Sequence, residues 1–304
     1  MKNPPFCAAI DWGTSTFRLW ILDPDGNVLA ERRSDDGLQS MAGREGFPGV
    51  MESHLAETGA PDSLPVIVCG MAGSRQGWVE ARYLDTPAPL DHVIESAVRV
   101  EGISRDVRIL PGVAQRDPDH PDVIRGEETQ LLGALATGIE DGLFCMPGTH
   151  SKWVALKAGT LEAFATYMTG ELFGLLARQS ILAHAISDTK ARPDDPDFLS
   201  AVEAGMARPA DIANRIFGIR PSQLLGFSAA GSGAAKLSGA LIGTEITGAR
   251  ARFGRLDHVH LIASGSLSKL YAKALEATGS TVDTLDADEV VRRGLHAAAR
   301  RFWS

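Results

Sequence analysis

The sequence of 304 residues has no apolar run of the roughly 18 to 20 residues that a membrane-spanning helix needs. It begins MKNPPFCAAID, which has neither the long apolar core nor the small-residue cleavage site of a secretory signal. These absences argue against a membrane protein and against a secreted one. We therefore expect a cytoplasmic protein with no membrane partner.

Cysteine is scarce, and the three cysteines, Cys7, Cys69 and Cys145, lie far apart in apolar runs. Such cysteines do not form a disulfide framework, so we expect buried free thiols. The eight histidines show no metal-ligand spacing, and no transition metal is predicted. Lysine and arginine number 30 against 38 aspartates and glutamates, which argues against a nucleic-acid partner but leaves room for a small anionic ligand.

Three common motifs are also absent. No G-x-x-x-x-G-K-[ST] sequence occurs, which excludes a P-loop. The stretch GSGAAK at 231–236 lacks the last glycine of G-x-G-x-x-G and follows no expected strand, so it does not indicate dinucleotide binding. No G-x-S-x-G elbow is present, which argues against an α/β-hydrolase.

The composition itself is that of an ordinary globular protein, with 44% hydrophobic and 22% charged residues, and the length predicts two packed domains. Short apolar runs alternate with helical patterns, which favours an α/β fold. Strands are expected at residues 6–11, 17–23, 27–33, 64–70 and 107–112. Because DPDGN at 23–27 supplies the residues of a tight turn, the chain should open as an antiparallel meander.

The second half loosely repeats this opening. The stretch QRDPDHPDVIR at 115–125 is polar and without periodicity, as a linker would be. A helix is expected from residue 126, followed by three strands within 143–168, a largely helical stretch from about 170 to 250, a strand at 258–263 and helices to Trp303. The two halves suggest an internal duplication with a cleft between them.

Two turns rich in glycine and hydroxyls are candidate phosphate sites. The first follows Asp11 and contains Gly13, Thr14 and Ser15, and the second lies at 147–151. Backbone amides in such turns bind phosphate, and a carboxylate beside them can hold a hydrated Mg²⁺ at a nucleotide. The alternative for either turn alone is an ordinary hairpin.

Three further stretches have both a functional and an ordinary interpretation. In GMAGSRQGW at 70–78, Arg75 is either a clamp for carboxylate or sugar oxygens or a surface ion-pair partner. In RGEETQLLGAL at 125–135, one of the two glutamates is a general base, or both only interact favourably with the positive end of the helix dipole. The turn at 263–266 admits a flat ring or a phosphate, or only connects a strand to a helix.

In this order the stretches resemble the sugar kinases of the actin, Hsp70 and hexokinase superfamily, and most closely the 2-dehydro-3-deoxygalactonokinase family. The matching segments are DWGTSTFRLWILD, GMAGSRQGW, RGEETQLLGAL, MPGTHSKWV and MTGELFGLL. The resemblance implies an α/β fold of two RNase H-like domains with an ATP cleft between them. These would be residues 1–116 and residues 117–304, the second with a helical insertion at about 170–250.

The resemblance also implies roles for residues. Asp11 would be the carboxylate that works with Mg²⁺. The residues that would bind ATP are Gly13, Thr14, Ser15, Arg18, Gly148, Thr149, Ser264, Gly265 and Ser266, with His150 and Lys152 as further members of the second loop. Related kinases often have a second glycine in the adenosine turn, where Ser264 stands here.

On the acceptor side, related carbohydrate kinases carry G-D-Q at the start of the helix before the second phosphate loop. Glu127 is the positional match for the catalytic base, and Glu128 is the alternative. The residues that would bind the acceptor are Ser74, Arg75, Gln76 and Arg125.

The implied activity is the ATP- and Mg²⁺-dependent phosphorylation of 2-dehydro-3-deoxy-D-galactonate to its 6-phosphate in galactonate catabolism. Two alternatives would share the phosphate features: a kinase for another 2-keto-3-deoxy sugar acid or sugar, and a non-catalytic ATP switch of the actin or Hsp70 type. The expected partners are ATP and a sugar acid, and a homodimer is one arrangement that the sequence leaves open.

Overall fold

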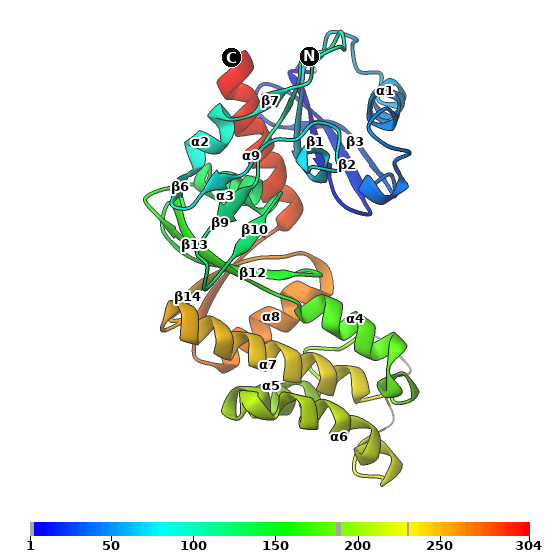
Figure 1. The fold of residues 1–304 in the computed structure, drawn as a ribbon, viewed down its shortest axis with the longest axis vertical. Helices are drawn as coiled ribbons and strands as arrows, with labels where there is room; N and C mark the ends of the chain where they lie inside the picture. Colours follow the sequence, from blue (N-terminus) through cyan, green and yellow to red (C-terminus); the bar gives the residue numbers. More distant parts are fainter. Residues whose placement is uncertain (1–2, 187–189, 230) are drawn as a thin grey trace. The chain divides into compact units, whose positions relative to one another are not determined.

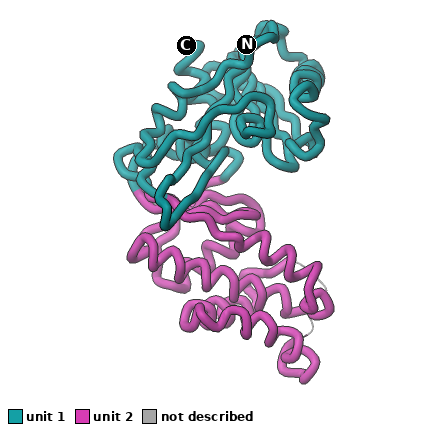
Figure 2. The backbone as a smooth tube through the Cα atoms, viewed as in Figure 1, with its two compact units in different colours: residues 1–141, 156–163, 287–304 teal, residues 142–155, 164–286 magenta. Residues whose placement is uncertain are grey.

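The computed structural model describes residues 3–186, 190–229 and 231–304. These residues form two compact units, which Figure 2 draws in different colours. Unit 1 comprises residues 1–141, 156–163 and 287–304, and unit 2 comprises residues 142–155 and 164–286. The expected division into domains 1–116 and 117–304 stays a prediction.

Unit 1 contains a six-stranded sheet with the strand order β3-β2-β1-β4-β8-β7 (Figure 1). Its strands are β1 (Cys7–Trp12), β2 (Phe17–Leu22), β3 (Val28–Ser34), β4 (Val66–Gly70), β7 (Val98–Arg99) and β8 (Val107–Ile109). The first three strands pair antiparallel, which confirms the expected meander. Strand β4 runs parallel to β1, and β8 runs parallel to β4.

A smaller sheet in unit 1 has the order β10-β9-β5, with β5 (Leu84–Asp85), β9 (Val113–Gln115) and β10 (Asp122–Ile124). Strands β9 and β10 pair antiparallel, so most of the polar stretch that we expected to be a linker is the loop of a hairpin. Strands of three residues are too short to show a periodicity in the sequence.

The helices of unit 1 are α1 (Gly46–Glu57), α2 (Leu90–Glu95), α3 (Glu127–Leu135) and α9 (Ala287–Trp303), with 3₁₀ turns at Leu38–Ser40 and Met71–Gly73. Helices α3 and α9 approach closely at two glycines. A Cβ at Gly133 would lie 1.8 Å from the carbonyl oxygen of Val290, and one at Gly294 would lie 2.0 Å from that of Thr129. Only glycine allows helix backbones to come this near.

Unit 2 contains most of a second six-stranded sheet, with the order β15-β14-β11-β12-β13-β6. Its strands are β11 (Gly142–Met146), β12 (Ser151–Lys157), β13 (Thr160–Tyr167), β14 (His258–Ile262), β15 (Thr281–Leu285) and β6 (Ala88–Pro89). Strand β6, the end of β12 and the start of β13, which pairs with β6, belong to unit 1. The strands expected within 143–168 and at 258–263 are confirmed. Strand β15 is not among the strands expected from the sequence. Its residues, TVDTL, are largely exposed at the edge of the sheet and do not form an apolar run.

The helices of unit 2 are α4 (Thr169–Gln179), α5 (Pro196–Ala207), α6 (Ile212–Leu224), α7 (Gly233–Phe253) and α8 (Gly265–Ala277), with 3₁₀ segments at Ile181–His184 and Pro209–Asp211. The expected helical stretch at about 170–250 is therefore helical over most of its described residues. Helices α5 and α7 lie side by side (Figure 1), and a Cβ at Gly243 would lie 2.2 Å from the carbonyl oxygen of Val202.

Each unit has its own apolar core. In unit 1 the ring of Trp12 lies 4.8 Å, centroid to centroid, from the rings of both Phe17 and Phe47. In unit 2 the core includes Trp153, Phe198 and Tyr271. The three cysteines are buried free thiols, as expected.

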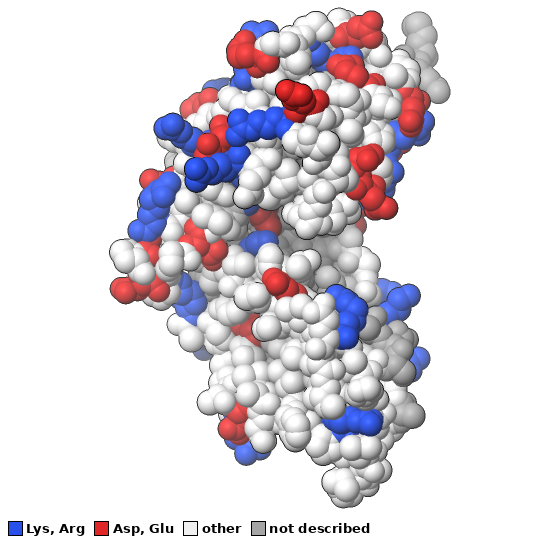
Figure 3. All heavy atoms as spheres, turned by 45° about the vertical axis from the view of Figure 1, so that its right-hand side comes forward, with Lys and Arg blue, Asp and Glu red and all other residues white. Residues whose placement is uncertain are grey.

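The surface carries charges of both signs. On the face drawn in Figure 3, basic side chains lie among acidic ones instead of gathering by sign. Ion pairs between exposed side chains include Arg116 with Asp85 and Arg293 with Glu289. Across the described residues, no helix combines the length and the apolar character that crossing a membrane requires.

Candidate active site

Asp11 lies near the end of β1, directly opposite Arg18 in the register of the β1–β2 pair. The Nη1 atom of Arg18 lies 3.4 Å from Oδ2 of Asp11 and 2.7 Å from Oδ1 of Asp288, at the start of α9. The Asp11 side chain is 20% exposed, so its carboxylate remains accessible to a ligand. Sequence analysis predicts Asp11 and Arg18 together, but it gives no indication of Asp288.

The turn after β1 is held from behind by a separate part of the chain. The amides of Leu38 and Gln39 donate to the carbonyl oxygens of Gly13 and Thr14 at 3.0 and 2.9 Å. A Cβ at Gly37 would lie 2.5 Å from the backbone of Ser15, so this support can pack close to the turn. The side chains of Thr14 and Ser15 are exposed. The turn is therefore a supported loop that carries exposed hydroxyl side chains, which suits an anion.

Two glycines bring the start of α3 to the end of β4, beside Asp11. Gly70 has a φ of 87°, and a Cβ there would lie 2.6 Å from the carbonyl oxygen of Trp12 and 3.4 Å from Oδ1 of Asp11. Gly126 has a φ of 106°, and its Cβ would lie 3.7 Å from the Cα of Gly70. Glu127, the next residue, is thereby placed within electrostatic range of Asp11.

The Asp11 carboxylate is affected by charged side chains of both signs. Burial raises the pKa of its carboxyl above the ordinary value, and the charges of Glu127 and Asp288 raise it further. Arg18 and a hydrogen bond from the thiol of Cys69 lower it only in part. Because burial is the main cause of the raised pKa, a cation bound at this carboxylate would stabilise its ionised form.

The two adjacent glutamates of α3 have different environments. Glu128 is fully buried, and its carboxylate accepts hydrogen bonds from the amide of Gly126 at 2.8 and 2.9 Å and from the hydroxyl of Thr129 at 3.1 Å. Burial raises its pKa to about 7. Glu127 is only partly buried, and it accepts a hydrogen bond from the amide of Arg125 at 3.0 Å.

The expected acceptor residues lie on two neighbouring segments of unit 1. Ser74 is buried, and within the described residues its hydroxyl has no hydrogen-bond partner, whereas Arg75 and Gln76 are exposed. The guanidinium of Arg125 lies 4.3 Å from the ring centroid of Tyr83 and donates to the carbonyl of Ala81 at 2.9 Å.

Arg125 also carries donors without an acceptor. Its Nε and Nη1 atoms are buried, and the described part of the chain offers them no partner. The Nη1 atom faces Gly73, where a Cβ would lie 2.9 Å away. Buried donors without a partner are costly, so this region is suited to a ligand that supplies acceptor oxygens.

In unit 2 the second turn packs against the start of α4. A Cβ at Gly170 would lie 2.3 Å from the carbonyl oxygen of Gly148, and the amide of Glu171 donates to the carbonyl of Thr149 at 2.8 Å. His150 pairs with Glu171 at 2.5 Å on the surface. The segments MPGTHSKWV and MTGELFGLL, which are separate in the sequence, therefore form one structure.

A cavity of about 130 Å³ in unit 2 connects this turn to the expected adenosine turn. Gly148 and Ser266 both line it, and the other lining residues include Phe173, Lys190, Leu241, Leu270 and Tyr271. Ser264 is the N-cap of α8, and its hydroxyl donates to Asp286 at 2.9 Å. The cavity is thus lined by both apolar and polar side chains, as sites for small organic ligands commonly are.

Glu245 on α7 is a second residue for which the sequence gives no indication. It is 2% exposed and accepts hydrogen bonds from Ser151 at 2.7 Å, Trp153 at 2.8 Å and Tyr271 at 2.6 Å. Burial raises its pKa, and a hydrogen bond from Thr169 lowers it in part. This carboxylate connects β12, α4 and α8, and its partners Thr169 and Tyr271 line the cavity, so it positions residues of the cavity.

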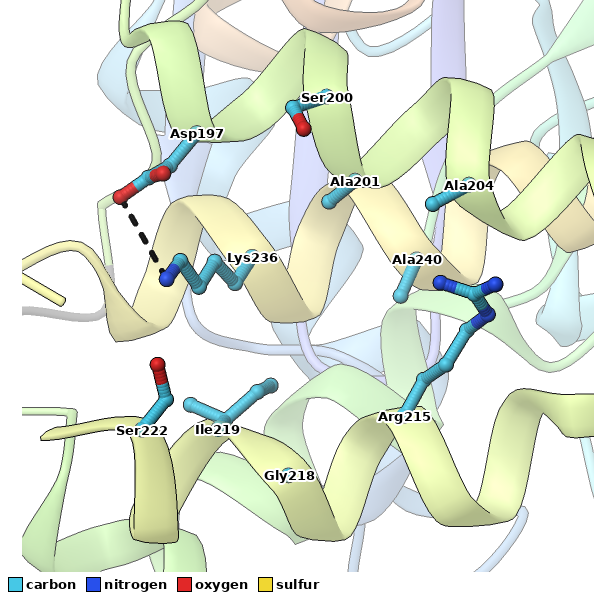
Figure 4. Close-up of a pocket in the computed structure, with 10 residues that line it drawn as sticks. All are labelled: Asp197, Ser200, Ala201, Ala204, Arg215, Gly218, Ile219, Ser222, Lys236 and Ala240. Carbon is cyan, nitrogen blue, oxygen red and sulfur yellow. Dashed lines mark ion pairs between the residues drawn. The ribbon is translucent and has the colours of Figure 1, made fainter. Parts of the chain in front are cut away.

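A separate cavity of about 330 Å³ lies among α5, α6 and α7, outside the sequence-predicted residues (Figure 4). Lys236 and Asp197 form an ion pair at one end, with 3.8 Å between Nζ and Oδ2, and Arg215 lies at the other end. None of its lining residues belongs to a segment that carries the resemblance.

Comparison with known proteins supports the resemblance to the 2-dehydro-3-deoxygalactonokinase family over nearly the whole chain. Residues 11–298 match the family model described as 2-keto-3-deoxy-galactonokinase. A probable 2-dehydro-3-deoxygalactonokinase of Rhizobium meliloti (strain 1021) is 52% identical, covering 100% of this chain and 99% of its own, and the 2-dehydro-3-deoxygalactonokinase of Escherichia coli (strain K12) is 32% identical, covering 96% of both. A crystal structure from Sinorhizobium meliloti, provisionally described with the same activity, has a TM-score of 0.93 at 52% identity, covering 98% of this chain and 99% of its own.

Proposed function

Because this chain belongs to the 2-keto-3-deoxy-galactonokinase family, we propose that it transfers the γ-phosphoryl group of ATP to the terminal hydroxyl of 2-dehydro-3-deoxy-D-galactonate. The product is the 6-phosphate. The observation that carries the proposal is that Glu127, at the start of α3, lies close enough to Asp11, near the end of β1, to affect its pKa. Gly70, at the end of β4, lies between these two segments. An ATP-dependent kinase needs the ATP pool of the cytoplasm, so we assign the protein to that compartment.

The finer fold assignment is part of the same proposal. It comprises two RNase H-like domains of the actin, hexokinase and Hsp70 superfamily, with residues 1–116 and 117–304 sharing one ATP site. The strand order β3-β2-β1-β4-β8 of unit 1, an antiparallel meander extended by two parallel strands, supports it. In unit 2, the cavity that reaches from Gly148 to Ser266 supports an adenosine site.

Asp11 has the chemistry of a Mg²⁺ ligand. Mg²⁺ prefers carboxylate oxygens and keeps several waters, and the Asp11 carboxylate is partly exposed. Burial is the main cause of the raised pKa of Asp11, with smaller contributions from Glu127 and Asp288, so a cation bound at this carboxylate would stabilise its ionised form. Mg²⁺ bound with ATP would neutralise charge on the phosphates, and Asp11 would hold it.

In the proposed reaction, the carboxylate of Glu127 accepts the proton of the acceptor hydroxyl as the hydroxyl oxygen bonds to the γ-phosphorus. The bond between that phosphorus and the oxygen that bridges it to the β-phosphate breaks, and ADP leaves. The amides and hydroxyls of Gly13, Thr14 and Ser15, and those of Gly148 and Thr149, would donate to phosphate oxygens. Glu128 instead positions the start of α3, because both its oxygens already accept hydrogen bonds from the helix.

The acid end of the acceptor would meet the donors of Ser74, Arg75 and Arg125. Arg125 and Ser74 hold buried donor atoms that lack a protein acceptor, and a carboxylate could accept from several of them. Gln76, exposed beside Arg75, would contact sugar hydroxyls.

An assay of ADP release with a panel of 2-keto-3-deoxy sugar acids and sugars tests the proposal. We expect release that depends on the acceptor and has the highest kcat/KM with 2-dehydro-3-deoxy-D-galactonate. A higher value with another acid or sugar would select a kinase of different specificity. ATP binding without acceptor-dependent release would select a non-catalytic switch.

Glu127→Gln tests the assignment of the base. Proton abstraction by a positioned side chain contributes roughly 10² to 10⁴ in rate, so kcat should fall by about that factor while ATP and acceptor still bind. Glu128→Gln is the matched control, since it removes a carboxylate one residue away, and it should lower kcat less. The opposite ranking would move the base to Glu128.

A further inference from the structure

Two histidines and an aspartate lie together on the edge of the sheet in unit 2. His258 and His260 are two residues apart on β14, so both side chains project from the same face of the strand. Strand β15 runs parallel to β14, and Asp283 lies opposite His260 in its register. One ligand atom from each of the three residues lies within 4.8 Å of the other two.

The distances among these three side-chain atoms suit the binding of one ion by all three residues. Nε2 of His258 lies 2.7 Å from Oδ2 of Asp283, and Nδ1 of His260 lies 3.8 Å from the same oxygen. Bonds of roughly 2.0 to 2.2 Å to a tetrahedral metal ion would place the donor atoms about 3.3 Å apart. The two observed distances lie on either side of that value, and the ligand nitrogens of the two histidines lie within 4.8 Å of each other, so side-chain rotations would bring the three atoms to this spacing.

One of the three ligands is held in position by its surroundings. The His260 side chain is 9% exposed, its ring centroid lies 5.0 Å from that of Phe144, and its Cδ2–Nε2 edge faces Gly142, where a Cβ would lie 2.7 Å away. This packing directs Nδ1 toward Asp283. His258 and Asp283 are 47% and 58% exposed, so an ion can enter from solvent.

We propose that His258, His260 and Asp283 form a binding site for a divalent transition-metal ion of the Zn²⁺ class. Imidazole and carboxylate ligands suit Zn²⁺ and related ions, whereas Mg²⁺ and Ca²⁺ prefer all-oxygen sites. Three protein ligands leave a position for water. The bound ion would link β14, which leads to the Ser264 turn, to β15, which leads to Asp286, the hydrogen-bond acceptor of Ser264.

An ordinary surface pair of histidine and carboxylate does not explain this group. Such a pair exists at His120 and Asp117, with 3.1 Å between Nδ1 and Oδ2, but no second imidazole joins it in a group of three ligands. In the described ranges, His258, His260 and Asp283 are the one group of three potential metal ligands within reach of one another. The second imidazole, fixed in the sheet, distinguishes the two cases.

Titration calorimetry of the tag-free full chain with Zn²⁺ tests the proposal, in the presence of excess Mg²⁺ to occupy hard-cation sites. We expect one Zn²⁺ per chain, and visible absorption when Co²⁺ replaces it. Loss of residues that merely orient a ligand weakens metal binding by about 10 to 100-fold, so His258→Ala and Asp283→Asn should each weaken it by at least about 100-fold. His120→Ala is the matched control and should leave the affinity unchanged.

Because His260 is buried, its replacement can unfold the sheet, so the two exposed positions decide the outcome. Absence of saturable one-to-one binding in the wild type would overturn the proposal. So would wild-type affinity in both His258→Ala and Asp283→Asn. Since binding is measured directly, neither result depends on whether the chain is a kinase.

Discussion

Replacing the buried Glu128 by glutamine should change how the stability of the protein depends on pH. Burial, with a smaller contribution from Glu127, raises the pKa of Glu128 from 4.5 to about 7 in the folded chain. In the unfolded chain the carboxyl has its ordinary pKa, so between these values the folded state binds more protons than the unfolded state. The contribution of this group to the free energy of unfolding therefore falls as the pH rises from 4.5 through 7.

The magnitude follows from the same two values. The interval from 4.5 to about 7, at about 1.4 kcal/mol per pH unit, corresponds to about 3 kcal/mol. Glutamine has nearly the same shape and cannot ionise. The free energy of unfolding of Glu128→Gln minus that of the wild type should therefore increase by about 3 kcal/mol between pH 4.5 and 8. A weakened hydrogen bond at Gly126 would shift this difference at every pH without changing its slope.

Urea unfolding followed by tryptophan fluorescence across this pH range measures the difference. Asp11 and Glu245, whose pKa values burial also raises, titrate in both proteins, so their contributions cancel. Leu131→Ala is the matched control. Leu131 is buried in the same helix, so its truncation lowers stability without removing a carboxyl, and the wild-type slope should persist.

Parallel pH dependence in the wild type and in Glu128→Gln would refute the reasoning. It would mean that this carboxyl titrates alike in the folded and unfolded chains. Glu128 would then be in contact with water, and its assignment as a buried positioning residue would lose its basis.

Three further substitutions test the proposed site by steady-state kinetics. Asp11→Asn should lower kcat by at least about 10²-fold with an unchanged circular dichroism spectrum, because a ligand for the phosphate-bound cation is lost; full turnover at saturating Mg²⁺ would contradict that role. Arg75→Ala should raise the acceptor KM about tenfold or more and the ATP KM little, since a charged contact to the acceptor is removed, whereas equal changes would point to a role other than acceptor binding. Gly170→Ala should raise the ATP KM about tenfold while sparing the acceptor KM, because its Cβ would lie 2.3 Å from the carbonyl oxygen of Gly148; an unchanged ATP KM would remove the second turn from the nucleotide site.

The sequence predicts those parts of the fold whose signals are local. The opening meander depends on apolar runs and on a turn that forms from its own residues. Asp23 accepts hydrogen bonds from the amides of Asp25 and Asn27, and Gly26 has a φ of 82°. Each of these features is readable within five consecutive residues, so β1, β2 and β3 could be predicted.

Residues that depend on distant contacts could not be predicted. Asp288 appears in the sequence as an acid in the first turn of a helix, yet it forms an ion pair with Arg18, which is 270 positions away. Glu245 appears as a polar position in a helix, and only the packing of β12, α4 and α8 shows that it is buried. The H-x-H pattern of β14 carries no metal signal until β15 places Asp283 opposite it.

The choice between Glu127 and Glu128 shows how local and distant information combine. Adjacent helical residues point about 100° apart, so the sequence alone indicates that one of them can face the substrate but not which. The direction is set by Gly126, whose φ of 106° and close approach to Gly70 fix how α3 begins beside β4. With that start, the Glu128 carboxylate turns back to the amide of Gly126 and is buried, while Glu127 remains accessible and affects the pKa of Asp11. The proposed assignment of Glu127 as the base therefore depends on the backbone geometry of Gly70 and Gly126, because without it the same two glutamates could exchange roles.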